Sequence, residues 1–150
     1  KEGNLCITDK RMTRFNITIK EAVNFVISIL DVTLGGEIFV PKLFSYKITD
    51  VAEAIGPTCK HEIVGIRSGE KIHEEMITFA DSINTIDLGD KYAILPSDGE
   101  LLKKYNKKRI DYKNVPHAFH YDSFDNSQYL TIEQIRELIK ENLFPEFVPI

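Results

Sequence analysis

The stretch "TIKEAVNFVISILDVTLGGEIFV", residues 18–40, decides the class of the fold, because it places a helix directly before a strand. Apolar residues recur at helical spacing over residues 19–32, which predicts an amphipathic helix. Thr18 and Glu21 stand where a capping box would start that helix. The β-forming residues 37–40 predict a short strand after it. A helix followed by a strand favours an α/β protein.

The same order repeats further along the chain. Residues 48–56 predict a short helix, and residues 61–66 predict the strand that follows it. Residues 84–89 and 91–96 predict two more strands, joined by a tight turn at Gly89. This alternation is typical of a small α/β unit.

The last third of the chain has weaker signals until its final helix. Residues 98–109 predict a short exposed helix, and the aromatic, turn-rich residues 115–129 predict a loop. A capping box at Thr131 predicts a last helix that ends near Leu143. Because no repeat or linker interrupts the pattern, we expect residues 1–150 to form a single domain.

Composition excludes several classes of protein. The 150 residues are 43% hydrophobic and 28% charged, which fits a globular domain rather than a disordered chain. The net charge of -4, without a basic stripe, argues against a nucleic-acid partner. No apolar run approaches the roughly 20 residues that cross a bilayer, so we expect no membrane span and a cytoplasmic location. Cys6 and Cys59 are far apart and are given no role.

Several catalytic patterns are missing from the sequence. No glycine-rich turn joins a strand to a helix, and no tyrosine is followed four residues later by a lysine. We therefore expect no cofactor-binding and no catalytic residue in this chain. His73 lacks the second histidine of a zinc-protease helix, and His117 and His120 are interpreted as packing residues. We predict no metal site.

Two arginine-centred stretches remain as candidates for binding. They are "DKRMTRFNIT", which contains Arg14, and "GIRSGEKIHEE", which contains Arg67 and Glu70. An arginine fork matches the paired oxygens of a diphosphate, and a nearby carboxylate accepts hydrogen bonds from ribose hydroxyls. The residues by themselves also allow a solvated surface pair, so both interpretations stay open at this point.

These stretches do not stand alone. In order along the chain, "ITDKRMTRFNIT", "GGEIFVPK", "HEIVGIRSGEKIHEEMI" and "INTIDLGDKYAILP" resemble the carboxyl-terminal half of the inverting UDP-N-acetylglucosamine 4,6-dehydratases. These belong to the extended short-chain dehydrogenase/reductase family and act in polysaccharide biosynthesis. The resemblance implies an α/β fold, namely the small substrate-binding domain of such an enzyme without its N-terminal Rossmann portion.

The resemblance also implies roles for individual residues. Arg14 and Arg67 match the family arginines that contact the substrate diphosphate, and Glu70 matches the acid beside the uridine ribose. Ser68 stands where many relatives have proline, which leaves the backbone before Glu70 less restricted. Lys71 and His73 lie close to Glu70 in the sequence and are interpreted as surface residues.

The implied parent enzyme is an NADP-dependent UDP-sugar dehydratase, a lyase. Oxidation at C4 acidifies the C5 proton, water leaves from C6, hydride returns there, and C5 inverts. The missing N-terminal portion would bind NADP and supply the catalytic groups. Because the chain enters the family pattern directly after Lys1, we expect it to be part of a larger protein.

The same resemblance suggests partners and alternatives. We expect a UDP-sugar, the N-terminal Rossmann portion and further copies of the protein as partners, because the early helix packs against the cofactor domain in relatives and would otherwise leave an apolar patch. A UDP-sugar 4-epimerase of the same family is the first alternative. A stand-alone module that binds a UDP-sugar or a protein without catalysis is the second.

Overall fold

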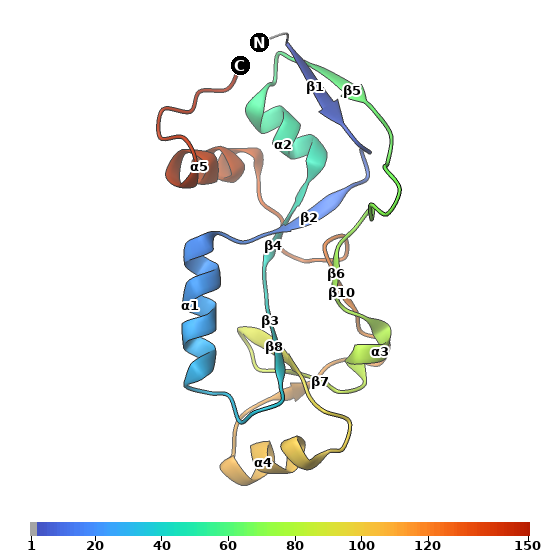
Figure 1. The fold of residues 1–150 in the computed structure, drawn as a ribbon, viewed down its shortest axis with the longest axis vertical. Helices are drawn as coiled ribbons and strands as arrows, with labels where there is room; N and C mark the ends of the chain where they lie inside the picture. Colours follow the sequence, from blue (N-terminus) through green and yellow to red (C-terminus); the bar gives the residue numbers. More distant parts are fainter. Residues whose placement is uncertain (1–2) are drawn as a thin grey trace. The chain divides into compact units, whose positions relative to one another are not determined.

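The computed structural model describes residues 3–150 and has a mixed α/β architecture (Figure 1). The chain forms two compact units, each assembled from segments that are not contiguous in sequence. The first contains the residues up to 16, 43–74 and 122–150, and the second contains 17–42 and 75–121. The single domain expected from the sequence stays a prediction. No helix in the described part of the chain is long and apolar enough to cross a bilayer.

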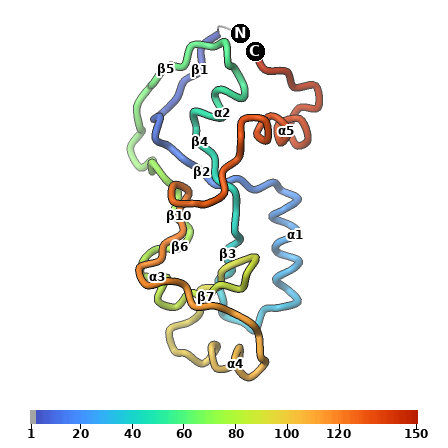
Figure 2. Tube along the Cα trace, turned by 180° about the vertical axis from the view of Figure 1, so that it is seen from behind, coloured from blue at the N-terminus to red at the C-terminus, as the bar shows by residue number. Residues whose placement is uncertain are grey.

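Paired strands and two helices build the first unit. Among the described residues its elements are β1 (Asn4–Ile7), β2 (Thr13–Asn16), β4 (Phe44–Lys47), α2 (Ile48–Ile55), β5 (Lys60–Ile63) and α5 (Ile132–Asn142). β1 pairs in parallel with β5, and β2 pairs antiparallel with β4. β4 continues directly into α2, and α5 lies beside α2 in both views of the chain (Figures 1 and 2).

The core of the first unit lies between its two helices. Ala54 from α2 and Ile135 from α5 are buried together with Leu130, which precedes α5. The capping box predicted at Thr131 is confirmed, since the Thr131 hydroxyl accepts the Gln134 N–H and the Gln134 side chain accepts the Thr131 N–H. Burial of one apolar face of each helix is what holds them together.

The second unit contains a four-stranded antiparallel sheet. Its described elements are α1 (Ile19–Leu30), β3 (Ile38–Pro41), β6 (Glu75–Ile77), α3 (Phe79–Ser82), β7 (Thr85–Asp87), β8 (Lys91–Ile94), α4 (Glu100–Lys108) and β9 (Lys113–Asn114). The strand order is β3-β8-β7-β9. β6 pairs with β10 (Tyr121–Asp122), whose first residue belongs to this unit. The hairpin predicted at Gly89 is confirmed, and its φ of +96° is one that glycine adopts without strain.

The helix α1 begins where the sequence predicted. The Thr18 hydroxyl accepts the Glu21 N–H, and the Glu21 carboxylate accepts the Thr18 N–H at 2.7 Å. None of the helix residues is buried, however, and most of its large apolar side chains are exposed, whereas Phe25 and Ile29 are half-buried. The most exposed are Ile19 at 85% and Leu30 at 69%. An amphipathic helix with a bare apolar face is unusual, because such faces are normally covered in soluble proteins.

Three of the predicted elements differ from the structure. The strand predicted for residues 61–66 ends at Ile63, because Gly65 has a φ of +87°, which no strand accepts. The helix near residue 100 is not fully exposed, since it buries Leu101 and Tyr105 against the sheet. The loop predicted for residues 115–129 contains β10.

Gly56, at the end of α2, lacks space for a side chain. A Cβ built there would lie 2.6 Å from the Cys59 sulfur and 3.0 Å from a Leu5 methyl group. We expect Gly56→Ala to destabilise the protein by about 1–3 kcal/mol, as overpacking does. Chemical denaturation would measure the loss. Adding Cys59→Ala to Gly56→Ala should recover part of it, with Cys59→Ala alone as the control. An unchanged midpoint in Gly56→Ala would contradict the steric explanation.

Candidate functional site

Residues 64–74, here called the 64–74 loop, leave β5 and carry the predicted binding residues Arg67 and Glu70. The Val64 N–H donates to the Ile7 carbonyl at 2.9 Å, and beyond it the loop is exposed as far as residue 71. Gly69 has a φ of +85°, and this left-handed position lets the chain turn sharply. The loop therefore presents its middle to solvent.

The structure brings Arg67 and Glu70 together in a local turn. The Glu70 N–H donates to the Arg67 carbonyl at 3.1 Å, and the Glu70 carboxylate accepts the Arg67 N–H at 3.0 Å. The Arg67 guanidinium has no hydrogen-bond or ion-pair partner among residues 3–150. All of its donors are available to a ligand, and the Glu70 carboxylate keeps lone pairs for further hydroxyl donors.

Arg14 lies on β2, and its guanidinium is already engaged in hydrogen bonds. Nη1 donates to the carbonyls of Thr13 at 2.7 Å and Ile72 at 3.1 Å, and Nη2 donates to the Lys71 carbonyl at 2.9 Å. Nε lies 3.3 Å from the Glu74 carboxylate. Arg14 thus holds the end of the 64–74 loop in place through these bonds. Its side chain is only 22% exposed.

Buried hydroxyls, which the sequence analysis did not single out, hold the same end of the loop. The Thr13 hydroxyl lies 2.6 Å from the Ser123 hydroxyl and 2.8 Å from Nδ1 of His73. The Ser123 hydroxyl also accepts the Glu74 N–H at 2.9 Å. His73 was interpreted as a surface residue, but it is half-buried, with its ring centroid 4.6 Å from that of Phe124. No sequence signal links these residues, since Thr13 and Ser123 are 110 positions apart.

Asp9 lies in the turn before β2, and its carboxylate binds Arg11. Its carboxylate accepts hydrogen bonds from the Arg11 side chain at 2.8 and 3.0 Å and from the Arg11 N–H at 2.8 Å. The side-chain bonds and then the backbone bond from Arg11 lower the pKa of Asp9 to about 2. Asp9 is therefore ionised at neutral pH and fixes the shape of this turn.

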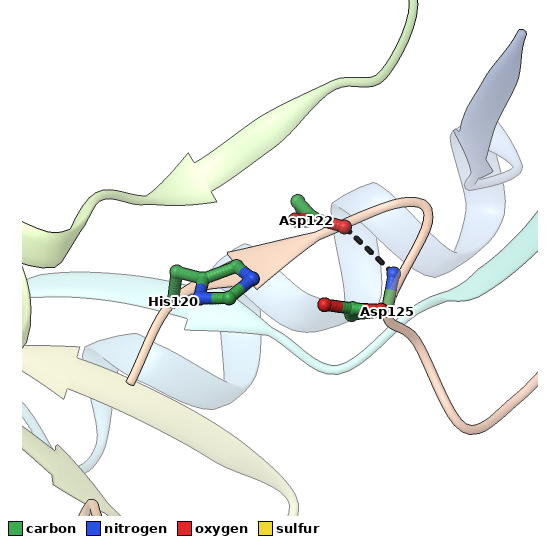
Figure 3. Close-up of side chains that lie close together, drawn as sticks. All are labelled: His120, Asp122 and Asp125. Atoms are coloured by element: carbon green, nitrogen blue, oxygen red, sulfur yellow. Dashed lines mark hydrogen bonds between the residues drawn. The ribbon is translucent and has the colours of Figure 1, made fainter. Parts of the chain in front are cut away.

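The Asp122 carboxylate closes a turn near residue 120. Figure 3 shows Asp122 at the end of β10 and Asp125 on the turn that follows it, with a hydrogen bond between them. One Asp122 oxygen accepts the N–H groups of Phe124 at 2.7 Å and Asp125 at 2.8 Å, which closes the turn. His117 and His120 are exposed, and the His117 ring makes an edge contact with Phe79, as the packing prediction expected for His117. The absence of a metal site stays a prediction.

Known proteins with similar sequences are about twice as long as this chain. A UDP-N-acetylglucosamine 4,6-dehydratase (inverting) from Campylobacter jejuni is 42% identical over 139 residues, which are 90% of this chain and 42% of that protein. A UDP-glucose 4-epimerase from Rickettsia canadensis is 34% identical over 145 residues, which are 93% of this chain and 42% of that protein. The chain thus spans less than half the length of these relatives.

A solved structure supports the same relationship. Pen from Bacillus thuringiensis matches 96% of this chain and 43% of its own chain, with a TM-score of 0.75 and 26% sequence identity. The predicted fold class, a small α/β domain of an extended short-chain dehydrogenase/reductase, is confirmed. The resemblance to the inverting dehydratases is confirmed as well.

Residues 1–96 match the family model described as "Polysaccharide biosynthesis protein". Since that match covers more than half of the chain, the protein belongs to the family of polysaccharide biosynthesis proteins.

Proposed function

We propose that this chain is the UDP-sugar-binding part of an inverting UDP-N-acetylglucosamine 4,6-dehydratase that acts in polysaccharide biosynthesis. The relative from Campylobacter jejuni, 42% identical over 90% of the chain, supports the choice of enzyme. The observation that carries the binding role is the exposed turn in which the Glu70 carboxylate accepts the Arg67 backbone N–H, while the Arg67 guanidinium has no partner among residues 3–150.

The geometry suggests a different part of the ligand for each residue of the site. The Arg67 fork suits the paired oxygens of a diphosphate, and Glu70 suits the ribose hydroxyls. Arg14 is the second proposed diphosphate contact. Because its donors are bound to Lys71, Ile72 and Glu74, it reaches a diphosphate only by giving up some of these bonds. The remote binding energy from these residues would hold the sugar in place for the reaction.

NADP is the proposed cofactor of the whole enzyme, but no turn between a strand and a helix among the described residues is rich in glycine. A dinucleotide needs a glycine-rich turn between a strand and a helix, so that free backbone N–H groups meet the pyrophosphate. Here β4 runs into α2 through Lys47 without a glycine, and the Thr18 capping box already uses N–H groups at the start of α1. We therefore propose that another part of the enzyme binds NADP and carries the catalytic residues.

The exposed apolar face of α1 supports a further part of the proposal. Ile19, Val23, Val26, Ile27 and Leu30 are all more than half exposed. We propose that the N-terminal Rossmann portion of the enzyme covers this face, and that the whole protein is a cytoplasmic homo-oligomer. Apolar patches of this kind mark protein contacts.

Two alternatives have different outcomes in one assay. The 34% identical epimerase from Rickettsia canadensis favours a 4-epimerase, since both reactions start with oxidation at C4. A binding module without catalysis is the alternative from another class.

The deciding experiment incubates the intact protein with UDP-N-acetylglucosamine and NADP and identifies the sugar by NMR. We expect a 4-keto, 6-deoxy sugar with inverted configuration at C5. A C4 epimer as the product would replace the dehydratase with the epimerase. Binding of UDP-N-acetylglucosamine without any turnover would leave only the binding module.

A further inference from the structure

A chain of buried hydrogen bonds reaches His73 from the backbone of the neighbouring residue. The Glu74 N–H donates to the Ser123 hydroxyl at 2.9 Å, the Ser123 and Thr13 hydroxyls are 2.6 Å apart, and the Thr13 hydroxyl is 2.8 Å from Nδ1 of His73. Ser123 is fully buried, and Thr13 is only 2% exposed. Solvent therefore does not complete the hydrogen bonding of either hydroxyl.

Which group donates and which accepts in this series of hydrogen bonds follows from counting the available hydrogens. The Glu74 N–H only donates, so Ser123 accepts at one end. The Ser123 hydroxyl hydrogen has no acceptor other than Thr13 among residues 3–150. Thr13 then donates its own hydrogen to Nδ1 of His73 at 2.8 Å, although the Tyr129 hydroxyl is a second polar neighbour of Thr13. If His73 donated to Thr13 and Thr13 donated to Ser123, the Ser123 hydrogen would be buried without an acceptor, which costs about 1–3 kcal/mol.

This direction defines the chemical state of His73. An imidazole that accepts at Nδ1 carries its hydrogen on Nε2 when it is neutral. The ring is also held from the side by Phe124, at a centroid distance of 4.6 Å. Both constraints act on the residue three positions after Glu70, at the end of the loop that carries Arg67.

We propose that His73 is a positioning residue: Ser123 and Thr13 hold it as the Nε2–H tautomer, and this fixes the 64–74 loop so that Arg67 and Glu70 meet a UDP-sugar. The inference rests on the proposed function and deepens it. Among the described residues, the turn of Arg67 and Glu70 makes hydrogen bonds only between these two residues, so its orientation depends on how the loop is anchored. Binding residues held in place before the ligand arrives lose less conformational entropy.

Nitrogen NMR of the protein tests the tautomer without any ligand. For the neutral imidazole of His73 we expect Nδ1 to resonate as an unprotonated nitrogen and Nε2 as a protonated one. Thr13→Val keeps the shape of the side chain but removes the hydroxyl, and it should convert His73 into a mixture of tautomers. A protonated Nδ1 in the wild-type protein would overturn the proposed direction of the chain.

UDP binding measured by calorimetry tests the positioning role. We expect Thr13→Val and His73→Leu each to raise the Kd for UDP about five- to tenfold, whereas His73→Asn, which keeps an acceptor near the Nδ1 position, should raise it about twofold at most. In an Arg67→Ala background, Thr13→Val should have almost no further effect, because the loop then has little left to position.

The combinations separate positioning from a general structural effect. Equal factors for Thr13→Val with and without Arg67→Ala would overturn the inference, because independent sites add. If the wild-type protein did not bind UDP, the proposed function would fail and the positioning role with it, while the nitrogen spectrum would still report the tautomer. If UDP bound normally but His73→Leu had no effect, only the positioning role would fail.

Discussion

Arg67→Ala is expected to weaken UDP binding by about 10- to 100-fold, because hydrogen bonds to a charged group contribute about 1.5–3 kcal/mol. The unfolding midpoint should stay the same, since the Arg67 side chain is exposed and has no partner among the described residues. Calorimetric titration with UDP and chemical denaturation of the same sample would measure both quantities. A binding loss without a stability loss is the mark of a ligand contact.

The matched control for this variant is Lys140→Ala. Lys140 is an exposed cation on α5 with no ion-pair partner among residues 3–150, so its removal changes the net charge by the same amount. We expect it to leave UDP affinity nearly unchanged. Equal losses in both variants would show that only the overall charge matters, and the assignment of Arg67 to the diphosphate would be wrong.

Arg14→Ala should have its largest effect on stability. The substitution removes donors from the carbonyls of Lys71 and Ile72 and leaves the Glu74 carboxylate without its ion pair. Since the side chain is mostly buried, we expect a loss of about 2–4 kcal/mol in the free energy of unfolding. Arg14→Lys should recover only part of it, because an ammonium lacks the planar fork. Denaturant titration with a fixed m-value would measure both variants.

Arg11→Ala is the control for Arg14. Its pair with Asp9 is exposed, with 69% of the Arg11 side chain accessible, and exposed ion pairs contribute little. We expect no measurable shift of its unfolding midpoint. If Arg14→Ala were equally harmless, the hydrogen bonds of Arg14 to the 64–74 loop would not be important for the fold, and Arg14 would be free to serve a ligand.

Features that depend on neighbouring residues were predictable from the sequence. The starts of α1 and α5 follow from Thr18 and Thr131, because a capping box is made within four consecutive residues. The hairpin at Gly89 is equally local. The pairing of Arg67 with Glu70 was also visible, since both lie in one short turn.

Features that depend on contacts between distant segments were not predictable. The helix near residue 100 was expected to be exposed, yet Tyr105 is 1% exposed, because the sheet that covers it comes from other parts of the chain. β1 pairs with β5, and nothing within either four-residue segment specifies that partner. The division of the chain into two units likewise depends on which segments contact one another.

For the candidate site, the sequence by itself determined the residue types and the local turn: a guanidinium and a carboxylate, three residues apart, on an exposed glycine-containing loop. Only the tertiary structure decided what anchors that loop. Arg14 reaches carbonyls that lie 57 and 58 positions away, and Thr13 meets Ser123 across 110 positions. The physical reason is that hydrogen bonds act over about 3 Å in space, whatever the separation along the chain, so their partners are known only once the chain has folded.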